Sequence, residues 1–267
     1  MAELHTYDAH SIEEYIKLIF RIWDDWTQNG EVPEEIWYRG VHNKDKHKLL
    51  PRAYRQKGID EVSFLVKFQS LAPSFAFRDP HSDWDWLFLA QHYGLPTRLL
   101  DWTESPLVAL YFAFYEWEGN TDPAVWIIDA AKLNKVSIQD ESTLGVNTNT
   151  KFIEAWLPSE IKKGVKKFDF GSKKQNNNLP LAILPSRREP RIVAQQGMFT
   201  VHGFDKSPIE DIMLASVDGN QSICRINLIG FDSSEIKQQF RILGLNEIAL
   251  FPELSSVAKK LIEDYCE

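Results

Sequence analysis

The chain of 267 residues is 43% hydrophobic and 25% charged, and these proportions exclude collagen-like, disulfide-scaffold and wholly disordered proteins. Its formal net charge of -8 and isoelectric point of about 5.5 argue against a general electrostatic nucleic-acid binder and leave room for a local basic patch. Two cysteines, Cys224 and Cys266, lack the spacing of a zinc site or a redox pair, so we interpret both as thiols in a reducing compartment.

Neither a targeting segment nor a membrane span is indicated. Residues 1–10 have no apolar centre of the kind that a signal peptide needs. The longest apolar run, residues 107–115, is too short to cross a bilayer. We therefore expect a cytoplasmic protein that makes no membrane contact.

The first half of the chain predicts mostly helices. Ser11 and Glu14 form a capping box, after which apolar side chains recur at helical spacing as far as Trp23. Two later helices carry their own boundary signals, since Gly94 can end one and Ser105 can cap the next. After the first helix, the predicted elements of this half are helices over 60–71, 82–93 and 107–117 and strands over 35–40, 97–102 and 124–128.

The second half predicts mostly strands. Between residues 140 and 178 the pattern weakens, with helix-like pieces around Phe152 and Ile161 and a polar loop over 171–178. After that segment come predicted strands over 181–184, 198–201, 223–229 and 247–251 and helices over 234–243 and 254–265. Because helices and strands do not alternate regularly, we expect one α+β domain over 1–267, with a mixed or antiparallel sheet.

Polar side chains are densest in segment 91–107, which spans a predicted helix end, a strand and a helix start. Free N–H groups at a helix start bind anions, and Arg98 offers a planar fork for a phosphate, so this corner suits a nucleotide. The structural alternative stays open: Arg98 would pair with Asp101, Ser105 would cap the helix and Trp102 would lie in the core.

Four runs of the sequence, 37–40, 91–114, 191–200 and 250–254, together resemble the FRG domain family. The family takes its name from an aromatic-Arg-Gly signature, which here reads Tyr38-Arg39-Gly40. The resemblance implies a single FRG domain with an N-terminal helix over 1–34 and a core over 35–267. Such domains recur in bacterial and phage proteins, and the resemblance implies a role in defence or as a toxin.

The order of these runs is similar to the layout of ADP-ribosyltransferases, which break the bond between nicotinamide and ribose. Their transition state resembles an oxocarbenium ion, so the reaction needs a carboxylate near the ribose and cations at the diphosphate. The layout implies NAD as the substrate, Arg39 on its phosphate or ribose, and Glu247 as the catalytic carboxylate. Ser105 or Tyr111 would line the nicotinamide pocket. The layout departs from that family in two places, because no Ser-Thr-Ser strand is evident and Leu245 stands where a second acid is expected.

Other polar residues of the four runs complete the candidate site. Amide side chains can read a base or a carboxamide, and a histidine can act as general acid or base. The candidate substrate-binding residues are Tyr38, Gln91, His92, Arg98, Asp101, Trp102, Ser105, Tyr111, Gln195 and Gln196. A tight turn and a hydrogen-bonded histidine at a helix end would explain several of them equally well. The histidines lack ligand spacing, so we expect no metal centre.

A basic segment offers contacts for an acceptor molecule. Its candidate nucleic-acid contacts are Lys162, Lys163, Lys166 and Lys167, followed by Lys173, Lys174, Arg187, Arg188 and Arg191. Phe168 or Phe170 could stack on a base. A solvated lysine-rich loop accounts for the same residues.

Three functions follow from the sequence and remain open. The first is an enzyme that transfers ADP-ribose from NAD to a nucleic acid or a protein. The second is a non-catalytic module that binds a nucleotide or a partner. The third is a nuclease, which the absence of a compact carboxylate cluster disfavours.

Overall fold

A computed structural model describes residues 2–27, 33, 35–75, 80–146, 151–170, 173–219 and 221–266, and the structural statements below concern these residues. Its centre is an eight-stranded sheet with the order β1-β10-β4-β2-β3-β9-β8-β5. The strands are β1 (His5–Ala9), β2 (Ile36–Val41), β3 (Leu99–Thr103), β4 (Ala124–Asp129), β5 (Leu144–Gly145), β8 (Leu181–Leu184), β9 (Gly197–Val201) and β10 (Ile223–Leu228). Two edge pairs, β1 with β10 and β5 with β8, are parallel and the other pairs are antiparallel. The predicted α+β class with a mixed sheet is confirmed.

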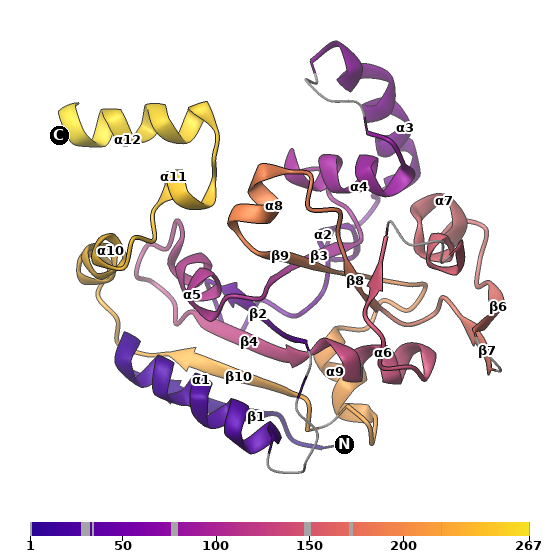
Figure 1. The fold of residues 1–267 in the computed structure, drawn as a ribbon, viewed down its shortest axis with the longest axis horizontal. Coiled ribbons are helices and arrows are strands. Elements are labelled where there is room, and N and C mark those ends of the chain that lie inside the picture. The colour runs from indigo at the N-terminus through magenta and orange to yellow at the C-terminus, as the bar shows by residue number, and fades with distance from the viewer. Residues whose placement is uncertain are drawn as a thin grey trace.

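Helices surround this sheet (Figure 1). They are α1 (Ile12–Thr27), α2 (Arg52–Arg55), α3 (Glu61–Leu71), α4 (Asp83–His92), α5 (Pro106–Phe114), α6 (Ala130–Ile138), α7 (Pro158–Ile161), α8 (Pro190–Ala194), α9 (Ile209–Ala215), α10 (Ser233–Ile242), α11 (Glu247–Leu250) and α12 (Leu254–Cys266), with short 3-10 helices over Ala72–Ser74 and Lys151–Trp156. The side chains of Asp60, Ser82 and Ser105 cap α3, α4 and α5, and the cap predicted at Ser105 is confirmed.

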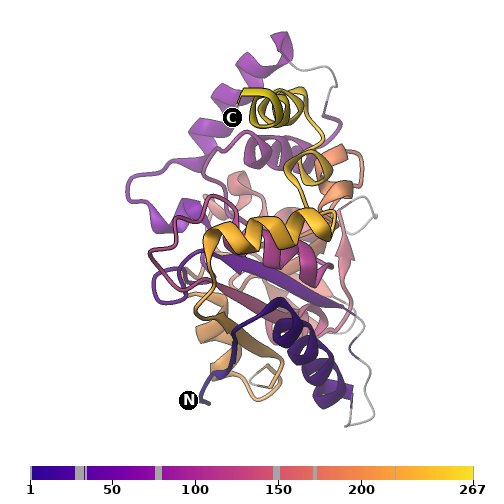
Figure 2. The same ribbon diagram turned by 90° about the vertical axis from the view of Figure 1, so that its left-hand side faces the viewer.

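The core lies on both faces of the sheet. One cluster joins β2, β4 and β10 to α1, α5 and α10, and a second joins the opposite face to α6 and α9. A third cluster packs α4 and the segment around Trp156 against β3, β8 and β9. The two ribbon views show α3 and α12 projecting from one end of the molecule, away from α1 (Figures 1 and 2).

Two predicted elements differ from the structure. Residues 247–251 were expected as a strand, but Glu247–Leu250 forms α11, because the Asn246 side chain accepts the N–H of Ala249 and caps a helical turn. The polar loop predicted over 171–178 contains a strand, β7 (Lys173–Asn176), which pairs with β6 (Lys167–Phe170) in a separate hairpin. Residues 171 and 172 of that loop lie outside the described residues.

Within the described residues, no helix combines the length and the apolar character needed to cross a membrane. The two cysteines lie in different environments. Cys224 is buried in β10, whereas Cys266 is exposed at the end of α12.

We expect one thiol to react in the folded protein. Burial raises the pKa of the Cys224 thiol and shields it, so a soluble disulfide reagent should modify Cys266 rapidly and Cys224 after denaturation. A thiol titration of the wild type and of Cys266→Ser checks this. Rapid reaction of native Cys266→Ser would contradict the burial of Cys224.

Candidate functional site

The main sheet is split between β2 and β3. β2 pairs with β4 along its whole length from Ile36 to Val41, but its pairing with β3 is confined to Tyr38 and Thr103. Beyond that pair the two strands separate, so backbone groups of β3 on this side have no ladder partner. We call this point the fork.

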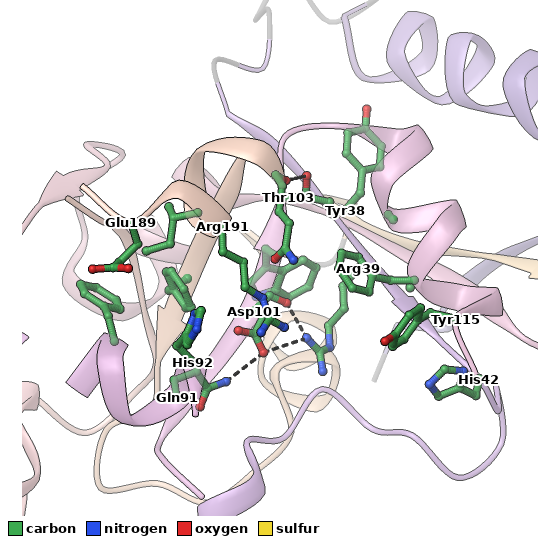
Figure 3. Close-up of a pocket in the computed structure, with 18 residues that line it drawn as sticks. Tyr38, Arg39, His42, Gln91, His92, Asp101, Thr103, Tyr115, Glu189 and Arg191 are labelled. Atoms are coloured by element: carbon green, nitrogen blue, oxygen red, sulfur yellow. Dashed lines mark hydrogen bonds and ion pairs between the residues drawn. The ribbon is translucent and has the colours of Figure 1, made fainter. Parts of the chain in front are cut away.

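Arg39 bridges the fork (Figure 3). Its Nη1 donates to the main-chain carbonyl of Asp101 at 2.5 Å and lies 3.7 Å from the Asp101 carboxylate. The Arg39 side chain is 20% exposed and that of Asp101 is 55% exposed. Burial lowers the pKa of the arginine and Asp101 opposes this effect. The pair therefore places one cation and one anion at the opening between the strands.

A pocket of about 290 Å³ lies at the fork, and we call it the fork pocket. Strands β2 and β3 supply its floor, α5 one wall, and α4 and α8 the other wall. Its lining residues include Arg39, Gly40, His42, Gln91, His92, Asp101, Phe112, Tyr115, Glu189, Arg191 and Gln195. Charged and amide groups thus face aromatic rings across a space large enough for part of a nucleotide.

Gln91 holds the Asp101 carboxylate in place. Its Nε2 donates to Asp101 Oδ2 at 2.9 Å, while its Oε1 accepts from the Thr97 hydroxyl at 2.5 Å. Both ends of the amide are therefore occupied, so its orientation is fixed. The Asp101 carboxylate consequently has a defined position between Gln91 and Arg39.

The end of α11 and the segment after it pack against residues that line the pocket. Gln195 Nε2 donates to the carbonyl of Leu250 at 2.9 Å, and the Arg191 guanidinium lies 4.6 Å from the centre of the Phe251 ring. His92 Nε2 lies 3.3 Å from a carboxylate oxygen of Glu253. Burial and then Arg191 lower the pKa of His92, so its imidazole is neutral near pH 7.

The Tyr38-Arg39-Gly40 signature has a physical explanation at the fork. Tyr38 is buried in the cluster shared with α1 and α5, whereas Arg39 reaches Asp101 in the pocket. Gly40 lies against the backbone of α5, where a β-carbon would be 2.1 Å from the carbonyl oxygen of Ala109. Tyr38 thus anchors β2 in the core, Arg39 places a cation in the pocket, and Gly40 leaves room for the backbone of α5.

Comparison with known families supports the resemblance to the FRG domain family. The family model of the FRG domain matches residues 34–121. The chain contains an FRG domain. No curated protein and no solved structure gives a significant match. The match spans both strands of the fork together with α4 and α5, and the assignment of residues 122–267 to the same domain stays a prediction.

The structure brings together part of the predicted site. Seven candidates line the fork pocket: Tyr38, Arg39, Gln91, His92, Asp101, Trp102 and Gln195. Two of them contribute little side chain, since Tyr38 is 6% and Trp102 3% exposed. Trp102 Nε1 donates to the Thr200 hydroxyl inside the core. The other five are Arg39, Gln91, His92, Asp101 and Gln195.

Glu247 is not among the residues that line the fork pocket. It begins α11 and its carboxylate lies 2.8 Å from Lys259 Nζ. The strand that was expected to carry it toward Arg39 is absent, because these residues form a helical turn. The structure therefore separates the two residues that the sequence paired as catalytic.

Arg98 has a different partner from the one expected. It is 5% exposed, and its guanidinium donates to Glu61 at 2.9 and 2.6 Å. The alternative in which Arg98 pairs with Asp101 is therefore wrong, since Asp101 faces Arg39. Neither Arg98 nor Glu61 lines the fork pocket.

Three further candidates lie outside the pocket lining. Ser105 accepts the N–H of Val108 and caps α5. Tyr111 lines a neighbouring groove between α5 and α10. Gln196 has a φ of 47° in the turn before β9, and its carbonyl accepts the N–H of Glu104. These positions favour structural roles for Ser105 and Gln196.

The basic segment is less cationic than its sequence indicates. Lys162 pairs with Asp60, and both Lys163 and Lys166 pair with Glu160. Lys167 is exposed on β6. Two carboxylates, Asp60 and Glu160, thus offset half of the positive charge that the four lysines would present to a phosphate backbone.

No group of three or more His, Cys, Asp or Glu side chains that could hold a metal ion occurs among the described residues. Sequence reasoning missed the contributions of His42, Tyr115 and Arg191 to the pocket. Arg191 was assigned to the basic segment instead. A signal for Tyr115 existed, because it ends an aromatic helix that begins at the capping Ser105.

Proposed function

We propose that the fork pocket binds NAD and that the protein transfers ADP-ribose to a macromolecular acceptor, a nucleic acid or a protein. The observation that carries this proposal is the opposed pair of Arg39 and Asp101 at a pocket with aromatic and amide walls. The arginine suits a phosphate or ribose hydroxyl, and the rings suit a planar base. A cytoplasmic role in bacterial defence or as a toxin is part of the proposal and rests on the family resemblance.

In this reaction the bond between ribose C1′ and the nicotinamide nitrogen breaks, and nicotinamide leaves with the electron pair. A lone pair on the acceptor then bonds to C1′, and the acceptor loses its proton. Positive charge develops on the ribose, so a fixed carboxylate nearby lowers the barrier. Asp101 is held by Gln91 and faces the pocket, whereas Glu247 does not. We therefore assign the carboxylate role to Asp101.

We expect nicotinamide release from NAD to depend on Asp101 and Arg39. Loss of one electrostatic group in an active site lowers kcat by about 100-fold or more. The kcat of Asp101→Asn and that of Arg39→Gln should therefore each decrease by this order. Glu247→Gln is the matched control and should keep its activity, since it lies outside the pocket lining. The assay uses purified protein with NAD and with RNA, DNA or cell extract as acceptor.

The same assay separates the competing assignments. Full activity of Asp101→Asn together with loss in Glu247→Gln would return the catalytic role to Glu247. Thermal unfolding of each variant shows whether a loss of activity reflects a loss of fold.

A non-catalytic binding module is the second candidate. It is favoured by the contacts of Asp101, whose carboxylate already faces Arg39 and accepts from Gln91 before any ligand is bound. This alternative predicts saturable nucleotide binding with no nicotinamide release for any acceptor. Release that scales with enzyme concentration and disappears in Arg39→Gln would exclude it.

A further inference from the structure

Helix α2 carries two arginines, of which Arg55 interacts electrostatically with Arg39 and Asp101 of the fork pocket without lining it. The helix is fixed by the N–H of Ala53, which donates to the carbonyl of Thr97 at 3.1 Å, and by the Tyr54 hydroxyl, which donates to the carbonyl of Gly203. Arg52 and Arg55 are three residues apart and therefore share a face of the helix. Both are exposed.

The two arginine side chains differ in their hydrogen bonding. Arg52 Nη1 donates to the carbonyl of Gly94 at 3.1 Å, in the turn that follows α4. For the Arg55 side chain the described residues supply no hydrogen bond and no ion pair, although it is close enough to Arg39 and Asp101 to interact electrostatically with both. Arg55 therefore has donors available beside the pocket.

Two histidines extend the same cationic group. The rings of His42 and His47 lie edge to face with their centres 6.1 Å apart, and His42 lines the fork pocket. Its Nδ1 is buried without a hydrogen-bond partner in the described structure. His47 interacts electrostatically with Arg39 and Arg55. Arginines from β2 and α2 and histidines from the intervening loop thus converge on one side of the pocket.

This arrangement carries an excess of positive charge. Asp101 is the carboxylate that acts on both Arg39 and Arg55, and a single negative charge does not balance two guanidinium groups. Like charges held close together raise the free energy of the unliganded protein, and a bound anion removes that cost. Guanidinium groups prefer phosphate oxygens because their paired N–H groups match them.

We propose that Arg55, together with Arg39 and with His47 beside them, forms the subsite for the diphosphate of the nucleotide bound in the fork pocket. The identity of the nucleotide rests on the proposed function, whereas the affinity for a diphosphate does not. Arg55 contributes binding energy and takes no part in bond breaking. It lies outside the four sequence runs that resemble the family.

Titration calorimetry with ADP-ribose tests the subsite, because this ligand carries the diphosphate but has no nicotinamide to release. Arg55→Gln should weaken ADP-ribose binding about tenfold or more, the usual effect of losing a charge-assisted hydrogen bond. It should weaken binding of inorganic pyrophosphate in parallel and leave adenosine binding unchanged. Arg21→Gln, on the exposed face of α1, is the control and should bind ADP-ribose as the wild type does.

Equal affinity of Arg55→Gln and wild type for ADP-ribose would overturn the subsite, as would a wild type that binds neither ADP-ribose nor pyrophosphate. Binding that depends on Arg55 without nicotinamide release from NAD would support the subsite and count against the transferase. Nicotinamide release from NAD by Arg55→Gln with an unchanged KM for NAD would support the transferase and count against the subsite. The two proposals therefore fail separately.

The pH dependence of binding supplies a second readout. Burial and then neighbouring cations, His42, Arg55, Arg39 and Lys46, lower the pKa of His47. A bound diphosphate raises that pKa, so binding takes up a proton and ADP-ribose should bind several-fold more tightly at about pH 5.5 than at about pH 8.

His42 contributes in the same sense. Burial and Arg39 lower its pKa, while the Ala113 carbonyl and Glu116 oppose them. The diphosphate of ADP-ribose does not titrate in this range. The pH effect should shrink in His47→Gln, and an affinity that is independent of pH in the wild type would count against a role for the histidines.

Discussion

Gly40→Ala will destabilise the FRG domain by at least about 3 kcal/mol, at the upper end of the usual cost of overpacking. A β-carbon at this position would lie 2.1 Å from the carbonyl oxygen of Ala109 and 2.4 Å from the amide nitrogen of Ala113. Both atoms belong to the backbone of α5, so no side-chain rotation relieves the overlap. The helix must move away from β2, and the fork pocket between them changes shape.

Urea unfolding of Gly40→Ala and of a matched variant measures this effect. Gly197→Ala is the control, because a β-carbon at Gly197 would meet its nearest neighbour, Ile192, at 3.5 Å, an ordinary contact distance. Gly197 also lies beside the pocket, at the start of β9. An unfolding free energy of Gly40→Ala within about 0.5 kcal/mol of wild type would show that α5 shifts at little cost.

The local signals in the sequence located most elements. Asp60, Ser82 and Ser105 begin their helices because each side chain accepts a backbone N–H three residues later. Glu247 was misplaced because a short apolar run fits both a strand and a helical turn, and the capping by Asn246 decided the outcome. β1 was missed because its parallel pairing with β10 depends on residues more than 200 positions away.

The site could be predicted in part, because some of its residues lie in recognisable sequence runs and others are brought to it only by tertiary packing. Arg39 and Asp101 lie in sequence runs with a recognisable pattern, and the structure brings them together across the fork. Arg55 and His47 have no such pattern, because their proximity to the pocket depends on how α2 docks onto the turn before β3. The sequence therefore placed Arg39 among the catalytic candidates and Asp101 among the substrate-binding ones, but it did not point to Arg55 or His47.

Glu61→Ala is the second substitution with a large expected effect. Both carboxylate oxygens of Glu61 are used, since Oε1 accepts the main-chain N–H of Arg98 at 2.8 Å and Oε2 accepts two guanidinium donors. Glu61 is 7% and Arg98 5% exposed, so water cannot replace the lost partner. Removing one member of a buried ion pair leaves an uncompensated charge and costs about 3–5 kcal/mol.

A double-mutant cycle distinguishes the pair from simple loss of packing. If the uncompensated charge of Arg98 is the main cost, Glu61→Ala with Arg98→Leu should be more stable than Glu61→Ala alone, although it lacks one more polar group. The exposed pair of Lys17 and Glu13 gives the comparison, and Lys17→Ala should not measurably change stability. Additive losses of unfolding free energy in the cycle would show that Glu61 and Arg98 do not stabilise the fold as a pair. Because Arg98 precedes β3 and its guanidinium also contacts the Tyr54 hydroxyl of α2, the buried pair joins α3 to α2 and to the start of β3, one of the strands of the fork pocket.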